Sequence, residues 1–102
     1  MRVPGSHADI LARPVRAVLS TLEPGGGLRS SPCTCRGGGD RLIVTSVEEA
    51  QARQMGLNPR VSIMIVDPGN VDRWLCVQGD AALRRGSWEV PLRRVMVFPV
   101  MK

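Results

Sequence analysis

The sequence predicts a mainly β domain, folded as a small antiparallel barrel with one or two short helices. Stretches rich in β-branched and aliphatic residues recur along the chain, and short turns containing glycine or proline separate most of them. Only one stretch has the pattern of a well-formed helix, and no segment is repeated. Strands joined by such short connections pair mostly in antiparallel fashion. We expect six strands, at residues 16–22, 28–35, 41–45, 61–66, 73–83 and 95–101.

The N-terminal part of the chain predicts a short helix and then three strands. Residues 6–13 begin with a serine, carry an acid three positions later and stop at Pro14, which indicates two helical turns. A run of three glycines then joins the first two strands as a hairpin, because glycine adopts positive φ at little cost. A second glycine turn leads into residues 41–45, a strand that is apolar on both faces.

Residues 46–59 form the clearest predicted helix. Ser46 and Glu49 have the spacing of a capping box, and Gly56 is a candidate C-terminal cap. An Asn-Pro pair ends the segment, since proline cannot continue a helix. The helix therefore joins the third strand to the fourth.

The C-terminal half predicts three further strands. A turn after residues 61–66 leads into a long strand over 73–83, with Gly79 as its bulge or bend. Pro99 confines the last strand, 95–101, to an edge or a bulge, because proline cannot donate a ladder hydrogen bond.

The length of 102 residues predicts one domain, since two domains would need a longer chain. A domain this small gains stability from a partner subunit or a bound cofactor, so a dimer is expected. Of its residues 43% are hydrophobic and 23% are charged, which is ordinary for a globular protein. No apolar run approaches the roughly 20 residues of a membrane span, and no secretory leader opens the chain. We expect a cytoplasmic protein without a membrane partner.

The chain has fourteen basic residues, thirteen arginines and one lysine, against nine acidic residues, which gives a net charge of +5. Arginine binds phosphate and carboxylate groups in bidentate fashion, so a phosphorylated ligand and nucleic acid are both compatible with this composition. Scattered arginines that form a solvated surface are an equally open interpretation. Nucleic acid is disfavoured, because the chain has only Trp74, Trp88 and Phe98 as aromatic residues for base stacking.

The three cysteines predict neither a disulfide framework nor a metal centre. Their number is odd, and the chain has one histidine, His7. Cys33 and Cys35 are two positions apart and therefore point to the same face of a strand. Zinc sites usually need two spaced pairs or added histidines, so we expect reduced cysteines that serve as small buried apolar residues.

Several segments, taken in order, resemble a known family. Residues 66–79 read Val-Asp-Pro-Gly-Asn-Val-Asp-Arg-Trp-Leu-Cys-Val-Gln-Gly. This is similar to the signature Asp-Pro-x-Asn-Pro-x-Arg-x-Leu-x-Val-x-Gly of the pyridoxamine 5'-phosphate oxidase-like (PNPOx-like) FMN-binding split barrels, with valine for the second proline. Residues 16–22, 40–46 and 52–62 look like other strands and the helix of that family, in its PPOX-class F420-dependent oxidoreductase branch. The resemblance covers residues 7–85.

The resemblance implies a split β-barrel of six antiparallel strands that assembles as a homodimer with its cofactor site at the interface. It implies an oxidoreductase that moves a hydride between bound coenzyme F420, or alternatively FMN, and an unknown small organic substrate. Hydride transfer is the chemistry of the cofactor itself, so no catalytic side chain is named. A non-catalytic barrel that binds a flavin, F420 or a tetrapyrrole remains the alternative.

The segment from the third strand into the helix is the expected site of the cofactor's phosphate tail. Thr45 and Ser46 bring hydroxyls to a helix start, where unpaired backbone N–H groups favour an anion, and Arg53 can reach back. By the resemblance Val44 and Gln51 also belong to this site, with Gln51 where the family has a lysine. A capping box without a ligand is the alternative interpretation of the same residues.

The same resemblance places the cofactor ring along the first two strands, in a pocket that the second subunit completes. The residues expected near the ring are Arg16, Leu19, Ser20, Thr21 and Pro32.

Residues 86–92 lead almost directly into the last strand, where members of the family usually carry a further strand and a helix. We therefore expect a single split-barrel domain that is shortened near its C-terminus.

Overall fold

The computed structural model describes residues 1–37 and 39–99. Within these residues the chain forms eight strands, one α-helix and one 3-10 helix. The elements are the 3-10 helix η1 (Ala8–Leu11), β1 (Val15–Leu22), β2 (Leu28–Gly37), β3 (Arg41–Thr45), α1 (Glu49–Leu57), β4 (Arg60–Asp67), β5 (Asn70–Asp80), β6 (Ala82–Arg84), β7 (Ser87–Pro91) and β8 (Arg94–Phe98). No helix among the described residues is long and apolar enough to cross a membrane.

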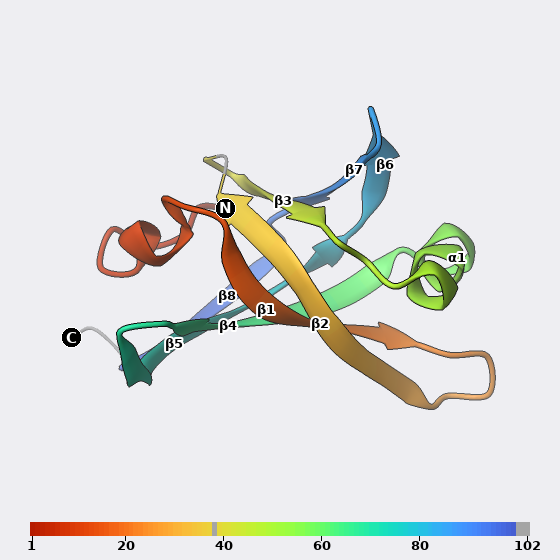
Figure 1. Cartoon of the computed structure of the whole chain (residues 1–102), viewed down its shortest axis with the longest axis horizontal. Helices are drawn as coiled ribbons and strands as arrows, with labels where there is room; N and C mark the ends of the chain where they lie inside the picture. The colour runs from red at the N-terminus through yellow and green to blue at the C-terminus, as the bar shows by residue number, and fades with distance from the viewer. Residues whose placement is uncertain (38, 100–102) are drawn as a thin grey trace.

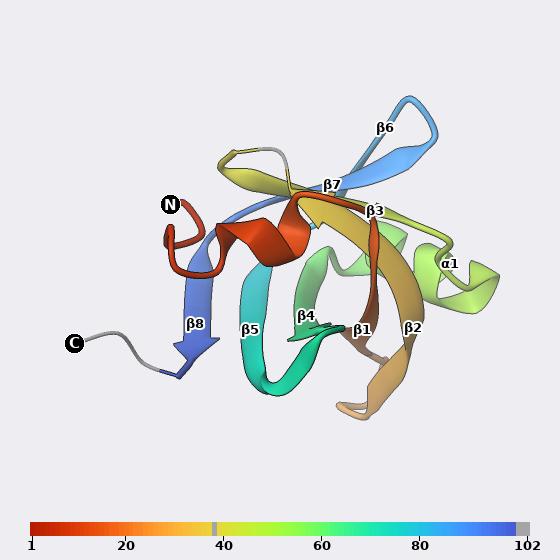
Figure 2. The same cartoon turned by 60° about the vertical axis from the view of Figure 1, so that its left-hand side comes forward.

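All strands belong to one antiparallel sheet, with the order β6-β7-β3-β2-β1-β4-β5-β8. Figure 1 shows β1 and β2 crossing the middle of the molecule, with α1 standing at one side. In Figure 2 the strands β8, β5, β4, β1 and β2 lie side by side and curve around an interior. The predicted mainly β barrel is confirmed, and only the number of strands differs.

The barrel interior is filled by side chains that alternate along each strand. In β1 the odd-numbered residues, from Val15 to Thr21, are buried and the even-numbered ones point outward. The core collects Ile10, Leu11, Val15, Ala17, Leu19, Cys33, Cys35, Leu42, Val44, Met55, Val61, Ile63, Ile65, Leu75, Val77, Ala81, Val90 and Leu92. Cys33 and Cys35 thus share the inner face, as their spacing predicts.

Gly79 allows β5 to pass close to the end of β7. A Cβ atom at Gly79 would lie 2.3 Å from the carbonyl oxygen of Pro91 and 2.8 Å from Cγ1 of Val90. The Arg93 N–H donates to the Gln78 carbonyl nearby, over 3.0 Å. The prediction of a bulge at Gly79 is wrong, because this residue pairs in regular register with Val61. Glycine is present there because of a close approach between strands.

The predicted long strand 73–83 is divided after Asp80. The N–H of Ala81 donates to the Pro59 carbonyl over 2.8 Å, and the chain then leaves its ladder with β4. Residues 82–91 instead form the β6–β7 hairpin around Arg85 and Gly86, which have φ of +52° and +80°. The expected direct link at 86–92 is therefore wrong, and the hairpin accounts for the two additional strands among the described residues. The shortening of the domain stays a prediction.

The last strand lies at an edge of the sheet, as predicted, but it ends before Pro99. Residues 100 and 101 of the predicted strand lie outside the described residues.

Both helices differ from their predicted lengths. The expected two turns over 6–13 are a four-residue 3-10 helix, Ala8–Leu11. The expected helix over 46–59 spans Glu49–Leu57 and begins from Glu48, which makes no side-chain cap. Ser46 has φ of +58° and lies before the helix, so the predicted capping box is wrong. Gly56 is inside the helix and Asn58 is its C-cap, which corrects the predicted cap at Gly56.

Candidate functional site

The outward side chains of β2, β1, β4, β5 and β8 form one continuous surface, which we call the outer face. Strand register aligns these side chains in rows across the five strands. A polar row consists of Ser30, Ser20, Ser62, Gln78 and Arg94. The adjacent apolar row consists of Pro32, Val18, Met64, Cys76 and Met96.

Four of the five residues of the apolar row reach the surface, whereas Cys76 is buried, with 8% of it exposed. Val18 is 44% exposed, Met64 36% and Met96 41%, although all three lie within strands of the sheet. At the far end of the outer face Trp74 and Phe98 stack, with ring centroids 5.5 Å apart and planes 9° from parallel. A contiguous exposed apolar area of this kind usually marks a ligand or partner site.

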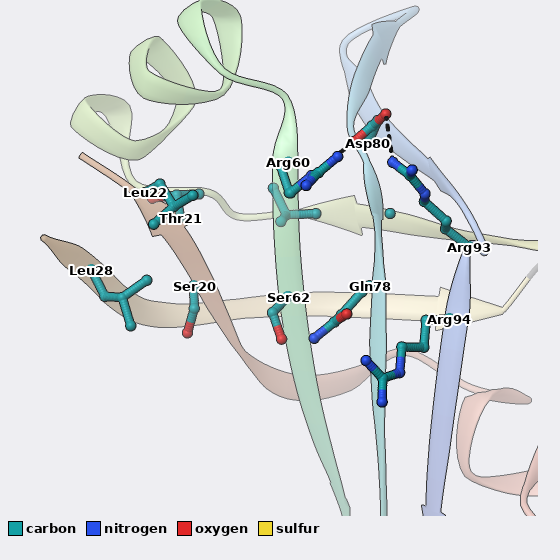
Figure 3. A pocket seen from close by; sticks show the side chains of 12 residues that line it. Ser20, Thr21, Leu22, Leu28, Arg60, Ser62, Gln78, Asp80, Arg93 and Arg94 are labelled. Carbon is teal, nitrogen blue, oxygen red and sulfur yellow. Dashed lines mark ion pairs between the residues drawn. The ribbon is translucent and has the colours of Figure 1, made fainter. Parts of the chain in front are cut away.

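A groove of about 720 Å³ lies at the polar end of the outer face (Figure 3). Its lining residues are Ser20, Thr21, Leu22, Leu28, Arg60, Val61, Ser62, Gln78, Gly79, Asp80, Arg93 and Arg94. Figure 3 shows the side chains of Ser20, Ser62, Gln78 and Arg94 following one another across the strands. The Ser20 and Ser30 hydroxyls are hydrogen-bonded over 2.8 Å beside the groove.

The groove is basic. Arg60, Arg93 and Arg94 line it together with one carboxylate, Asp80. Asp80 lies between two of the arginines, with its oxygens 4.0 Å from Nε of Arg60 and 3.8 Å from a terminal nitrogen of Arg93 (Figure 3). Among the described residues Arg94 has no ion-pair partner.

The ten residues predicted at the cofactor site fall into two sets. Four are fully buried or nearly so: Leu19, Thr21, Val44 and Gln51. The other six reach the surface: Arg16, Ser20, Pro32, Thr45, Ser46 and Arg53. The division follows largely from strand alternation, because neighbouring residues of one strand point to opposite faces. Of the residues predicted along one strand, only every second one therefore points to the outer face.

Gln51 attaches α1 to the first two strands from inside the barrel. Its side-chain N–H₂ group donates to the Leu19 carbonyl over 2.9 Å and to the Arg29 carbonyl over 3.2 Å. It also lies 3.3 Å from the Thr21 hydroxyl, and its carbonyl oxygen accepts from Ser31. With an exposed fraction of 0%, the Gln51 side chain contacts protein alone, so its direct effect is to position the helix.

The predicted phosphate corner consists of Thr45, Ser46 and Arg53, which all reach the surface. The Arg53 guanidinium donates to Glu49 one turn earlier in α1, over 3.0 Å. Glu48 accepts from Arg29 of β2 over 2.7 Å at the same end of the helix. The corner thus holds two carboxylates beside the cations that would bind an anion there.

Burial makes two of the cysteines unreactive. It raises the pKa of Cys33 to about 11 and, together with the charge of Cys33, that of Cys35 to about 12. Both thiols therefore stay protonated at neutral pH and are poor nucleophiles and metal ligands. No cluster of three or more His, Cys, Asp or Glu with the arrangement of a metal site occurs within residues 1–37 and 39–99.

Sequence reasoning missed the part of the outer face that β4, β5 and β8 provide. It assigns no role to Ser62, Gln78, Arg60 and Arg94. The pattern that could have identified Ser62 is the alternation of burial along β4, in which Ser62 falls on the less buried face. The register that brings these residues beside Ser20 depends on the β4–β5 turn and on β8, and sequence spacing does not reveal it.

The single antiparallel sheet curves around one core, and comparison with known proteins supports a split β-barrel fold. A protein described as an F420 reductase superposes with a TM-score of 0.78 and 19% identity, over 92% of this chain and 98% of that protein. HupZ from Group A Streptococcus gives a TM-score of 0.76 and 15% identity, over 94% of both chains.

A third structure, Atu2129 of unknown function from Agrobacterium tumefaciens, gives a TM-score of 0.72 and 15% identity. The match covers 98% of this chain but 59% of that protein. No family model and no curated protein sequence matches the chain. The likeness therefore concerns the fold.

Proposed function

We propose that this protein is an F420- or flavin-dependent oxidoreductase that binds its cofactor on the outer face, between two copies of the chain. The observation that carries the proposal is the outer face itself, where an exposed apolar row adjoins a polar row and a basic groove. The structural likeness to an F420 reductase, which extends over nearly the whole of both chains, supports the same assignment.

The rows match the chemistry of a flavin or deazaflavin. Such a cofactor has a planar, largely apolar ring with a polar edge and an anionic tail. Val18 and Met64 offer contact to one ring face, and the Ser20 and Ser62 hydroxyls can donate to or accept from the ring edge. When bound, the cofactor would supply the hydride chemistry. The protein's own residues orient the ring and hold it in a partly dry environment.

The second copy of the chain is proposed because the outer face is open. A ring lying on Val18 and Met64 would have one face in water, which permits side reactions of a reduced cofactor. Packing a second apolar row over the first would exclude that water and bury the exposed methionines. Both copies would then contribute to each site.

Fluorescence titration of the purified protein with F420 and with FMN tests the proposal, with the oligomeric state measured on the same sample. We expect saturable binding of one of the two with a Kd below about 10 μM, which corresponds to a binding free energy of roughly −7 kcal/mol. We also expect the protein to accelerate oxidation of the reduced cofactor by a panel of small electron acceptors. Absence of binding of both cofactors at tens of micromolar would contradict the proposal.

A non-catalytic module that holds a flavin, F420 or a tetrapyrrole is the second candidate. The composition of the two rows favours it, since they contain one arginine and one thiol but no carboxylate or imidazole that could transfer a proton to a substrate. Binding of a planar ligand without turnover in the presence of reductant would select this candidate over the oxidoreductase.

A further inference from the structure

Three arginines line a groove to which neither the sequence resemblance nor the comparisons assign a role. We propose that this groove is an oxyanion subsite, in which Arg94, Arg60 and Arg93 bind a phosphate group and Asp80 is an internal counter-ion that the phosphate displaces. The identification of that phosphate as the tail of the bound cofactor rests on the proposed function, whereas the subsite itself does not.

The chemistry of the groove suits a phosphate. Three arginines line the groove with one carboxylate, so the groove has an excess of positive charge. Arginine presents N–H donors in a planar fork that matches a phosphate, and such charge-assisted bonds are about twice as strong as neutral ones. Ser62 and Gln78 add neutral donors on the floor of the groove. The open volume of about 720 Å³ is ample for a phosphate and its ester chain.

Asp80 binds its arginines too loosely to saturate them. Its contacts to Arg60 and Arg93 are 4.0 and 3.8 Å long, and the three side chains are between 54% and 64% exposed. Exposed ion pairs of this length contribute little to stability. A phosphate dianion can therefore replace the carboxylate at small cost, and it gains Arg94, which has no ion partner among the described residues.

The arginines at the predicted phosphate corner lie closer to their carboxylate partners. The Arg53 guanidinium lies 3.0 Å from Glu49, and Arg29 lies 2.7 Å from Glu48 and 3.0 Å from Glu23. An anion at that corner would meet two glutamates at the start of α1. The groove is therefore the more favourable oxyanion site of the two, and it adjoins the polar row on which the ring edge is proposed to lie.

Titration with inorganic pyrophosphate, followed by amide chemical shifts in a ¹⁵N NMR spectrum, tests the subsite without any cofactor. We expect shifts centred on Gly79, Asp80 and Arg94. Arg94→Gln should weaken pyrophosphate binding by about ten-fold, the equivalent of one charge-assisted hydrogen bond. Asp80→Asn should tighten it several-fold, because it removes the competing carboxylate.

Arg36→Gln is the matched control, since Arg36 is exposed on β2 away from the groove lining and should leave binding unchanged. The gain expected from Asp80→Asn cannot arise from misfolding, so it separates a binding role from a structural one. Absence of shifts at the groove, or equal binding by the wild type, Arg94→Gln and Asp80→Asn, would overturn the subsite.

A comparison of FMN with riboflavin, which lacks the phosphate, tests whether the cofactor's tail occupies the groove. We expect FMN to bind about ten-fold more tightly than riboflavin and the difference to disappear in Arg94→Gln. A difference that persists in folded Arg94→Gln would overturn the assignment of the tail and leave the proposed function intact. If pyrophosphate binds at the groove and neither F420 nor FMN binds, the proposed function fails and the subsite stands.

Discussion

At the scale of single residues, buried polar side chains fix elements that the sequence pattern alone leaves free. Gln51 is the clearest case, because its amide group satisfies two backbone carbonyls on two different strands. Such carbonyls are costly to leave unpaired inside a protein. The role of Gln51 in this structure is therefore to hold α1 against β1 and β2.

Gln51→Ala should destabilise the protein by about 2 kcal/mol, since it removes a hydrogen-bond donor from the Leu19 and Arg29 carbonyls. Urea unfolding measures the change. Gln54→Ala is the control, because the Gln54 side chain makes no hydrogen bond within the described part of the chain. It should change the free energy of unfolding by less than about 0.5 kcal/mol. Equal effects of the two substitutions would contradict the positioning role of Gln51.

Two glycines should respond in opposite directions to alanine. Gly79→Ala should cost about 1–3 kcal/mol, because the new Cβ would lie 2.3 Å from the Pro91 carbonyl oxygen. Gly56→Ala should add about 0.5–1 kcal/mol, since Gly56 is inside α1 and has nothing within 4 Å of its Cβ position. Thermal unfolding of both variants checks the pair, and a stabilising Gly79→Ala would refute the close approach of β5 and β7.

Properties that depend on neighbouring residues of one strand could be predicted better than those that depend on distant contacts. Alternation correctly predicts that Cys33 and Cys35 share a face, since that property is local. The burial of Gln51 could not be predicted, because it depends on where α1 docks. Gly79 is visible in the sequence as a break in a strand pattern, but the reason for it is a contact with β7, which comes later in the chain.

At the scale of elements, the N-terminal segment is attached to the barrel by an arginine network. Arg73 of β5 donates to Asp67 over 2.8 Å and to Asp9 of η1 over 3.0 Å, and it also bonds the Ser6 carbonyl. The buried His7 beside it lies 2.9 Å from the Phe98 carbonyl of β8. These contacts connect the first residues of the chain to strands from its C-terminal half.

The Arg73 network should make stability dependent on pH in the acid range. The hydrogen bond and charge of Arg73 lower the pKa of Asp9, and the Gly69 N–H followed by Arg73 lowers that of Asp67. Because both pKa values lie below that of aspartate in the unfolded chain, about 3.9, the stabilisation is present above about pH 4. It is lost as the pH falls through the lower pKa values of the folded state.

Arg73→Met should therefore lower stability at pH 6 to 7 and have a smaller effect below about pH 4. Urea midpoints measured at several pH values check this, with Arg36→Met as the control at an exposed arginine outside the network. An Arg73→Met effect that is independent of pH would show that Arg73 acts through packing of its side chain and not through the two carboxylates.

Elements bounded by glycine and proline could be predicted closely, whereas those that depend on distant pairing could not. Residues 41–45 are a strand with the predicted bounds. The β6–β7 hairpin was missed because its turn places an arginine, Arg85, at φ of +52°, a conformation usually taken by glycine or asparagine. The helix begins at Glu49 and not at the predicted capping box, because Ser46 has a positive φ and redirects the chain after β3.

At the scale of the whole molecule, the split barrel presents its outer face as an open apolar surface. The exposed Val18, Met64 and Met96 lie on three different strands and form one row. The proposed second copy covers this row. The fold class could be predicted from the strands and turns, but the outer face requires the register of five strands.

Met64→Glu should shift a dimer to monomers, since a carboxylate at the centre of the apolar row would be buried without a partner. Sedimentation velocity at about 10–100 μM protein measures the change; at the lower end a dimer with a micromolar Kd is largely formed. Leu83→Glu is the control, because Leu83 is 59% exposed on β6 at the opposite end of the strand order. A wild-type monomer at all concentrations would contradict the proposed assembly.

Binding of a flavin or deazaflavin on the outer face can be located residue by residue in a ¹⁵N NMR titration with F420 and with FMN. We expect amide shifts to concentrate along β1, β4 and β5, around Ser20, Ser62 and Gln78, while β6 is unaffected. Shifts confined to the Thr45–Arg53 corner, or no shifts with either cofactor, would contradict it.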